Sequence, residues 1–324
     1  MSNFACACGI SGAESNLGFQ SGALTFRFAK RFLIMRKYDK GGNLNNIKST
    51  DLVAGKLPAS FLTEKLYNSD PSKRWLLTPE LDEVTDVRDA PITEQTGNSV
   101  ERIVDLGNRS ITANFLTPQE GYLRNLEKLE CQDLAFYMID NCGTIGGEWL
   151  EGGTILSPLP IGKDTFYAMP MPGTQSTKSK IQIQFQLDRT FADGDFDILP
   201  NGAIADGNEW LLRSGRSLQN VRVAISGIST TGFTAALTID GGNYNKSIKA
   251  VGWTTSNFAL YNNTDAGAVV ITSATETVVG ESGVYTFVIP SQTALDNLTL
   301  SGAIASNVFV KAPFQVVPTS FDIP

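Results

Sequence analysis

Apolar and polar residues alternate along several short segments of this chain, which is the pattern of strands that bury one face. The clearest case spans residues 180–187, where Ile181, Ile183 and Phe185 alternate with glutamines. We expect a half-buried strand there, with Leu187 continuing the inward row. The glutamines give its outer face an uncharged polar surface, which suits contact with another subunit.

Shorter strand patterns occur elsewhere in the first two thirds of the chain. Turn residues at 96–98 and at Gly107 separate three of these segments, and the spacing favours a meander of polar-faced strands. A tight turn at residues 140–143 separates two others. The expected strands span residues 24–38, 84–94, 99–106, 109–115, 134–139 and 144–150.

One helix is marked by its capping signals. Thr117 is suited to the N-cap, Pro118 to the first helical position, and Glu120 completes a capping box. The expected helix spans residues 118–130 and covers a sheet. Residues 50–67 are interpreted as a short helix or a loop. The apolar stripe of the main helix consists of Tyr122, Leu126 and Leu129.

The chain changes character near residue 217. Residues 218–324 hold 4 basic and 6 acidic residues, whereas the earlier part holds 22 and 27. Short strands separated by turns, one turn being residues 240–243, favour an immunoglobulin-like sandwich. The expected strands lie near residues 219–225, 233–239, 247–251, 256–261, 268–271, 284–289, 297–300 and 307–316.

The predicted fold is therefore mainly β. An N-terminal arm is expected over residues 1–22. A β-sandwich or barrel domain with one short helix is expected over residues 23–217. The immunoglobulin-like sandwich is expected over residues 218–324.

Composition narrows the possible functions. The 324 residues contain no histidine, which removes Ser-His-Asp and Cys-His nucleophile systems and metal sites that need imidazole. We therefore expect a protein that is not an enzyme. The net charge of -7 and the pI of about 4.8 disfavour tight nucleic-acid binding through phosphate neutralisation. An acidic surface can still line a path through which DNA slides, because repulsion prevents sticking.

The cysteines Cys6, Cys8, Cys131 and Cys142 do not have the spacing of a zinc site, and free thiols are expected. The N-terminus shows no signal peptide, and no apolar run is long enough for a membrane span. These observations favour synthesis in a cytoplasm, where the cysteines are kept reduced.

Alternating carboxylates at Asp193, Asp195 and Asp197 resemble the start of a calcium loop. The complete motif needs glycine at its sixth position and glutamate at its twelfth. Ile198 and Ile204 occupy those positions, so a solvated acidic turn is favoured over a cation site.

A second acidic cluster raises the possibility of a glycosidase, which needs two carboxylates facing each other across a groove. The nearby Arg88, Arg102 and Arg109 favour an ion-paired face instead. No catalytic residue, cofactor or metal ligand is predicted. The cluster consists of Glu80, Asp82, Glu83, Asp86, Asp89 and Glu94.

Four tryptophans offer another reading, because exposed indole rings stack on sugars. A carbohydrate-binding β protein would show them as an aromatic platform, although tryptophans in a chain of this length are more often core residues. The four are Trp75, Trp149, Trp210 and Trp253.

The order of elements in residues 24–198 resembles the tail-tube proteins of tailed bacteriophages. The likeness is carried by a long hairpin over 84–115, a helix over 117–129, the segment LAFYMIDNCGTIGGEW and a last core strand over 178–188. The segment RWLLTPELDEVTDVRDAPITE is also similar to virion proteins of phages that infect Bacteroidetes. The C-terminal part looks like the immunoglobulin-like domains added to phage tail proteins.

This resemblance implies a virion structural protein, assembled in the cytoplasm of a bacterial host. Subunits of the family form rings, usually of six, whose sheets join around a lumen that conducts genomic DNA without binding it specifically. The expected partners are further copies of the chain and other tail proteins, with residues 1–22 and 40–75 bridging rings. A connector, tail terminator, baseplate or capsid decoration protein is an open alternative.

Overall fold

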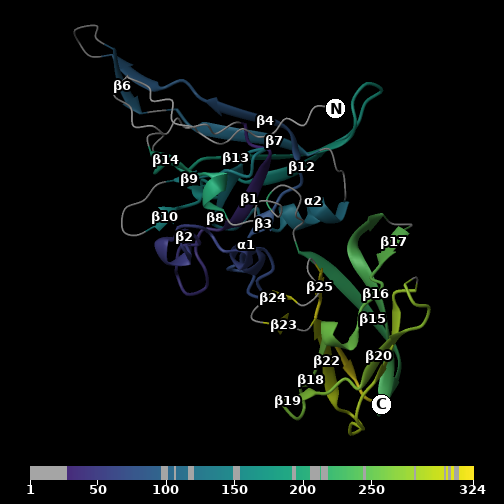
Figure 1. The fold of residues 1–324 in the computed structure, drawn as a ribbon. Helices are drawn as coiled ribbons and strands as arrows, with labels where there is room; N and C mark the ends of the chain where they lie inside the picture. Colours follow the sequence, from purple (N-terminus) through teal and green to yellow (C-terminus); the bar gives the residue numbers. More distant parts are fainter. Residues whose placement is uncertain are drawn as a thin grey trace, which may run out of the picture. The chain divides into compact units, whose positions relative to one another are not determined.

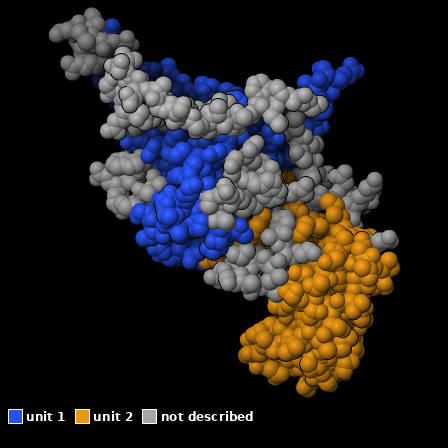
Figure 2. All heavy atoms as spheres, in the orientation of Figure 1, with its two compact units in different colours: residues 1–65, 72–118, 123–216 blue, residues 66–71, 119–122, 217–324 orange. Residues whose placement is uncertain are grey.

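The computed structural model describes residues 28–95, 101–105, 107–115, 120–148, 154–191, 195–204, 212, 218–243, 246–280, 282–302, 304–305, 308–309 and 314–324. Within these ranges the chain is mainly β, as the alternating pattern predicts, with two short α-helices (Figure 1). Residues 1–65, 72–118 and 123–216 form one compact unit (Figure 2). Residues 66–71, 119–122 and 217–324 form the second. The predicted arm, residues 1–22, lies outside the described residues.

The first sheet of unit 1 surrounds two buried strands. β1 (Arg31–Arg36) and β8 (Leu134–Ile139) pair antiparallel along their whole length, and their near-continuous apolar sequences are buried on both faces. Such runs suit a central strand. The strand order is β14 (Phe196–Leu199), β9 (Ile145–Glu148), β8 (Leu134–Ile139), β1 (Arg31–Arg36) and β3 (Leu76–Leu77), with β11 (Leu159–Pro160) also on β8.

The second sheet of unit 1 has four strands in the order β12 (Tyr167–Met171), β13 (Lys180–Gln186), β7 (Arg109–Phe115) and β4 (Leu81–Arg88). The alternation predicted for residues 180–187 is confirmed, because Ile181, Ile183 and Phe185 are buried and the intervening glutamines are not. β2 (Ile47–Lys48) and β10 (Thr154–Leu156) form a separate small pair.

Aromatic rings join the two sheets. Phe185 of β13 packs against Phe136 of β8 at 4.9 Å and against Phe32 of β1 at 6.0 Å between ring centroids. On the opposite face of β8, Tyr137 packs against Trp75 at 5.4 Å, and Trp75 contacts Phe61 of helix α1 (Ala59–Leu66). Successive residues of β8 therefore fill two different layers of the core.

The strands predicted as a meander form one long hairpin over residues 81–115 instead. β4 continues into β5 (Ile92–Gln95), β6 (Glu101–Asp105) continues into β7, and β4 pairs with β7 while β5 pairs with β6. Gly107 therefore does not start a chain reversal. The expected tip at residues 96–98 lies outside the described residues.

Two helices replace the single one predicted. α1 (Ala59–Leu66) lies within the segment interpreted as a helix or a loop. α2 (Glu120–Glu127) lies within the expected 118–130, although Thr117 and Pro118 are outside the described residues. Short 3-10 turns occur at Ser49–Asp51, Asn201–Ala203 and Thr255–Asn257.

Unit 2 contains two main sheets that share one apolar core. Phe233 and Phe287 of the first sheet stack at 4.7 Å, and Phe258 of the second contacts Phe287 at 4.9 Å. The first sheet has the order β20 (Ser273–Glu276), β21 (Val284–Val288), β16 (Gly232–Asn243), β15 (Gln219–Ser229) and β25 (Phe314–Val316), with β17 (Lys246–Lys249) on β16. The second has the order β19 (Gly267–Val269), β18 (Phe258–Asn262), β22 (Asn297–Gly302) and β26 (Thr319–Asp322), and β23 (Ile304–Ala305) pairs with β24 (Val308–Phe309).

The sequence pattern missed β20 and β26, and the turn expected at residues 240–243 is wrong because β16 continues through Asn243. β25 runs parallel to β15. An immunoglobulin-like topology for residues 218–324 stays a prediction.

A buried carboxylate organises the loops of unit 2. Glu276 accepts hydrogen bonds from the backbone N–H groups of Gly252 (3.0 Å), Gly280 (2.9 Å) and Gly283 (2.9 Å). Burial alone would raise the pKa of this carboxyl, but the backbone donors together outweigh it and the pKa is lowered. The ionised side chain therefore holds two loops against strand β20.

Candidate assembly surfaces

The four-stranded sheet of unit 1 carries a polar face opposite its buried apolar face. Because side chains alternate across a strand, the pairing register of β7 and β13 fixes which residues share that face. The resulting polar face consists of Ser110, Thr112, Asn114, Gln182, Gln184 and Gln186.

Hydrogen bonds connect this face to both neighbouring strands. Asn114 accepts from Gln182 at 3.2 Å and donates to Glu83 of β4 at 3.3 Å. Tyr167 of β12 donates to Gln184 at 2.6 Å. The amides are thus held in fixed orientations across the four strands.

The same face carries few charged side chains, and their net charge is slightly negative. Lys180 pairs with Asp82 at 2.6 Å, and this hydrogen bond raises the pKa of the lysine. Glu83 adds a negative charge. A surface of amides and hydroxyls with an acidic balance attracts little DNA phosphate.

The β12 edge of this sheet is blocked for main-chain pairing. The backbone N–H of Ala168 points away from β13, because it donates to the carboxylate of Glu130 at 3.1 Å. Residue 170, two positions further along, points its backbone to the same side. Pro170 has no N–H to offer there. Proline and charged side chains are features that protect a sheet edge from adding a further strand.

The β4 edge lacks this protection. Asp89 donates its backbone N–H to Asn108 at 2.9 Å, at the end of the β4–β7 ladder. Along an antiparallel strand, backbone N–H groups point alternately toward the paired strand and away from it. The N–H groups of Val84 and Asp86 therefore point away from β7. In the described part of the chain, no strand lies on that side of β4. The Asp86 side chain pairs with Arg109 at 2.6 Å.

The outer half of the long hairpin exposes large apolar side chains. We call residues 87–95 and 101–105 the ribbon. Its exposed apolar residues are Val87 (53%), Ile92 (55%), Ile103 (65%) and Val104 (60%). An isolated two-stranded hairpin is marginally stable in water, and these four side chains form an exposed apolar surface on the ribbon.

Close main-chain packing fixes the base of the ribbon. A Cβ atom added at Gly107 would lie 2.0 Å from the backbone oxygen of Asp89. Only glycine permits this approach, which brings the two halves of the hairpin together where they bend.

The calcium-loop hypothesis is not supported further. Asp193 lies outside the described residues, while Asp195 and Asp197 are half-buried. In the portion that the structure describes, no group of three or more acidic or cysteine side chains is arranged to hold a metal ion.

The acidic cluster is distributed along strand β4 and its flanks. Lys30 pairs with Glu80 at 3.2 Å, Lys180 with Asp82 and Arg109 with Asp86. Asp89 and Glu94 are exposed on the ribbon. The arginines predicted nearby thus supply one of these pairs, and two lysines from distant segments supply the others.

The tryptophans and cysteines do not form a site in the described residues. Trp75 and Trp253 are buried core residues, so neither forms a sugar-binding platform. Cys131 is exposed and Cys142 is buried at the turn between β8 and β9. The other predicted candidates, Trp149, Trp210, Cys6 and Cys8, lie outside the described ranges.

Sequence reasoning missed the blocked edge and the exposed ribbon. The sequence shows a proline at residue 170 and a glutamate at residue 130. Their roles at the sheet edge depend on the direction of the backbone N–H groups, which the sequence does not give. The exposed valines and isoleucines of the ribbon looked like ordinary strand residues, because periodicity does not distinguish a covered strand from an uncovered one.

Comparison with known proteins adds little to this geometry. No family model and no curated protein matches the chain, and no described helix is long and apolar enough to cross a membrane. A crystal structure of the N-terminal part of the bacterial S-layer protein SbsC is similar at 13% identity, over 38% of this chain and 30% of that one. Its TM-score of 0.24 carries no argument about fold or function.

Proposed function

We propose that this chain is a virion structural protein, with a tail-tube subunit as its leading form. The observation that carries the proposal is the two-faced sheet β12-β13-β7-β4, which is apolar toward the core and polar, ordered and weakly acidic on its other face. Such a face suits the lumen of a ring through which DNA slides, since the positive charge of Lys180 is offset by Asp82 and little remains to hold phosphate.

Assembly would use the surfaces that the single chain leaves uncovered. The ribbon exposes apolar residues, and among the described residues no strand covers the β4 edge, whereas the β12 edge is blocked. In the proposed ring, neighbouring subunits therefore contact each other through side chains, including those of the ribbon. They do not extend the sheet by main-chain hydrogen bonds at β12.

The blocked edge favours a second candidate over the continuous barrel that the resemblance implies. A connector, terminator, baseplate or decoration subunit contacts its neighbours without joining all sheets into one barrel. A tail-tube subunit should assemble into stacked tubes. A connector, terminator or baseplate subunit should form single rings, and a decoration subunit should form particles that bind capsids.

Electron microscopy of the purified full-length chain tests the proposal, with mass measured in parallel by light scattering. We expect rings or stacked tubes with a central hole. A chain that stays monomeric at high concentration contradicts the proposal.

A variant of the polar face tests which surface lines the hole. Gln182→Arg with Gln184→Arg should make the assemblies retain linear DNA at low salt, whereas the wild-type assemblies release it. Gln175→Arg with Ser176→Arg, on the exposed β12–β13 hairpin, is the matched control. Equal DNA retention by both pairs would show that the polar face does not line the lumen.

A further inference from the structure

Charge is distributed unevenly between two consecutive parts of unit 1. Residues 30–74 contain ten Lys or Arg and four Asp or Glu, a net charge of +6. Residues 75–105 contain two basic and eight acidic residues, a net charge of -6. The acidic part includes the ribbon, so an acidic extension and a basic segment coexist in one chain.

The ribbon combines this negative charge with exposed apolar residues. Asp89 and Glu94 are exposed beside Ile92, and Ile103 and Val104 lie on the paired strand. An interface that excludes water needs apolar contact as well as charge, because exposed ion pairs alone contribute little.

Lysines gather at a different place in unit 1. Lys48, Lys65 and Lys73 lie close enough to act on one another. Burial lowers the pKa of Lys65 most, Asp51 opposes this, and the positive charges of Lys73 and Lys48 lower the pKa further while Glu64 raises it. The Lys65 ammonium lies 5.4 Å from the ring centre of Phe61 and 5.6 Å from that of Trp75. Its position is therefore fixed by the core.

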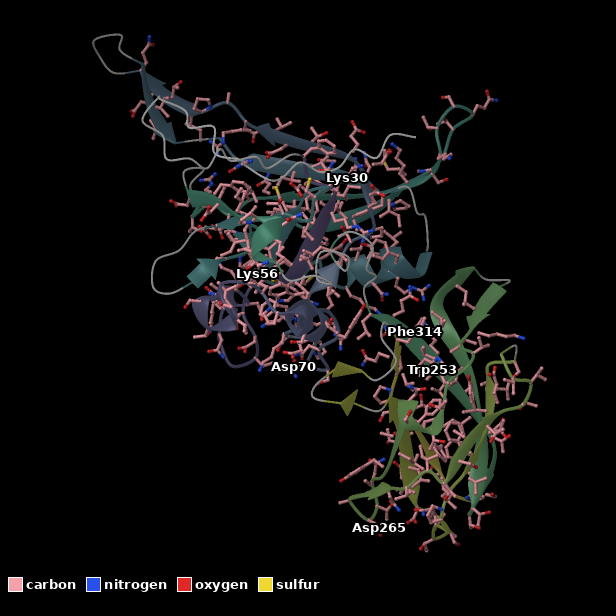
Figure 3. All side chains as sticks on the ribbon, viewed as in Figure 1. Lys30, Lys56, Asp70, Trp253, Asp265 and Phe314 are labelled. Atoms are coloured by element: carbon pink, nitrogen blue, oxygen red, sulfur yellow. The ribbon has the colours of Figure 1, made fainter. Side chains whose placement is uncertain are left out.

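Exposed neighbours complete this second surface. Lys48 and Lys56 are exposed, and Figure 3 shows Lys56 in the part of the unit that carries β2. Val53 is 66% exposed in the same turn. We call Lys48, Lys56, Lys65, Lys73 and Val53 the lysine surface. Asp39 pairs with Lys73 at 3.9 Å, and Asp51 and Glu64 act on Lys65. The exposed Lys48 and Lys56 therefore carry the positive charge of this surface beside the apolar Val53.

The two surfaces cannot meet within one copy of unit 1. In Figure 1 the ribbon strand β6 extends at the top of the unit, whereas β2 and α1 lie at its lower side. We propose that the ribbon of one copy docks on the lysine surface of a second copy, in a head-to-tail contact. This rests on the proposed function, since it names the surfaces through which the subunits assemble.

Such a contact is heterologous, because it joins two different patches of the same chain. Repetition of a heterologous contact gives a closed ring or an open filament, depending on the rotation between copies. The contact should weaken with salt, since opposite charges steer and orient the two copies.

Charge reversal tests the pairing directly. One variant carries Asp89→Lys and Glu94→Lys on the ribbon, and the other carries Lys48→Glu and Lys56→Glu on the lysine surface. Each variant alone should associate at least about tenfold more weakly than the wild type in sedimentation velocity, because like charges then face each other. An equimolar mixture of the two should regain association, since the reversed ribbon fits the reversed lysine surface.

Controls separate this inference from the proposed function. Lys163→Glu with Lys178→Glu reverses two exposed lysines outside both surfaces and should leave association unchanged. Circular dichroism matching the wild type confirms folding, and the mixture contains the same two chains. Wild-type association without any effect of charge reversal, or without recovery in the mixture, overturns the inference alone. A wild type that remains monomeric overturns the proposed function as well.

Discussion

Single acidic residues of this chain complete hydrogen bonds that its strands and turns leave open. Glu130 accepts the outward N–H of Ala168, and Asp140 accepts the N–H groups of Cys142 and Thr144 in the β8–β9 turn. Glu276 accepts three backbone donors. Part of the acidic composition is therefore structural, and it would be misread as surface charge from the sequence alone.

Replacing Glu276 tests the largest of these roles. Glu276→Gln presents an NH2 group to at least one backbone donor, and a charge-assisted hydrogen bond contributes about 1.5–3 kcal/mol. We expect unit 2 to lose stability by about that amount. Hydrogen exchange of residues 252–283 measures it, and Asp322→Asn, an exposed carboxylate, is the control.

The same carboxyl makes unit 2 sensitive to acid. Its pKa is lower in the folded state than its usual value of 4.5. Its contribution to stability is therefore present above about pH 4.5 and is lost as the pH falls through the folded pKa. Glu276→Gln should flatten this pH dependence; an unchanged slope would contradict the role of the ionised side chain.

At the scale of elements, the alternation of side chains was the most dependable guide. It located β13, β7 and β8 because each packs one or both faces on the core, and burial selects the pattern. It did not reveal that β6 runs on into β7. That continuity depends on the close approach at Gly107, which leaves the same sequence signal as a turn.

Gly107→Ala tests the base of the ribbon. The added methyl would overlap the Asp89 carbonyl, so the backbone must shift, at a cost of about 1–3 kcal/mol. We expect a lower thermal unfolding midpoint and faster hydrogen exchange in β4 and β7. Gly202→Ala, where a methyl would meet nothing within 4 Å, should change neither.

At the scale of the whole molecule, composition indicated an acidic protein that binds nucleic acid weakly. Composition does not show how the charged residues are distributed along the chain. The net charge of -7 conceals one segment of +6 followed by one of -6. The fold class was predictable because many short strands and turns permit few alternatives. The assembly surfaces were not, because exposure and backbone direction are properties of the folded chain.

Opening the blocked edge should change how the molecules associate. Glu130→Ala with Pro170→Val gives β12 usable N–H groups at positions 168 and 170, and an unprotected edge is an aggregation site. We expect sheet-rich aggregates detected by thioflavin binding. Glu127→Ala with Pro172→Ala is the matched control; equal aggregation of both pairs would mean that the edge was not blocked by these residues.

In the terms of polymer chemistry, the blocked edge limits how many contacts one molecule can make. A monomer with one reactive group can only cap a chain, whereas a monomer with two complementary groups can extend it. Among the described residues, the sheet β12-β13-β7-β4 is monofunctional at its edges, because β12 is blocked and no strand covers β4, so edge pairing of this sheet stops after two copies. In the contact that we propose, the ribbon and the lysine surface make the protein bifunctional. Growth is thereby confined to the contact whose geometry is specified by side chains.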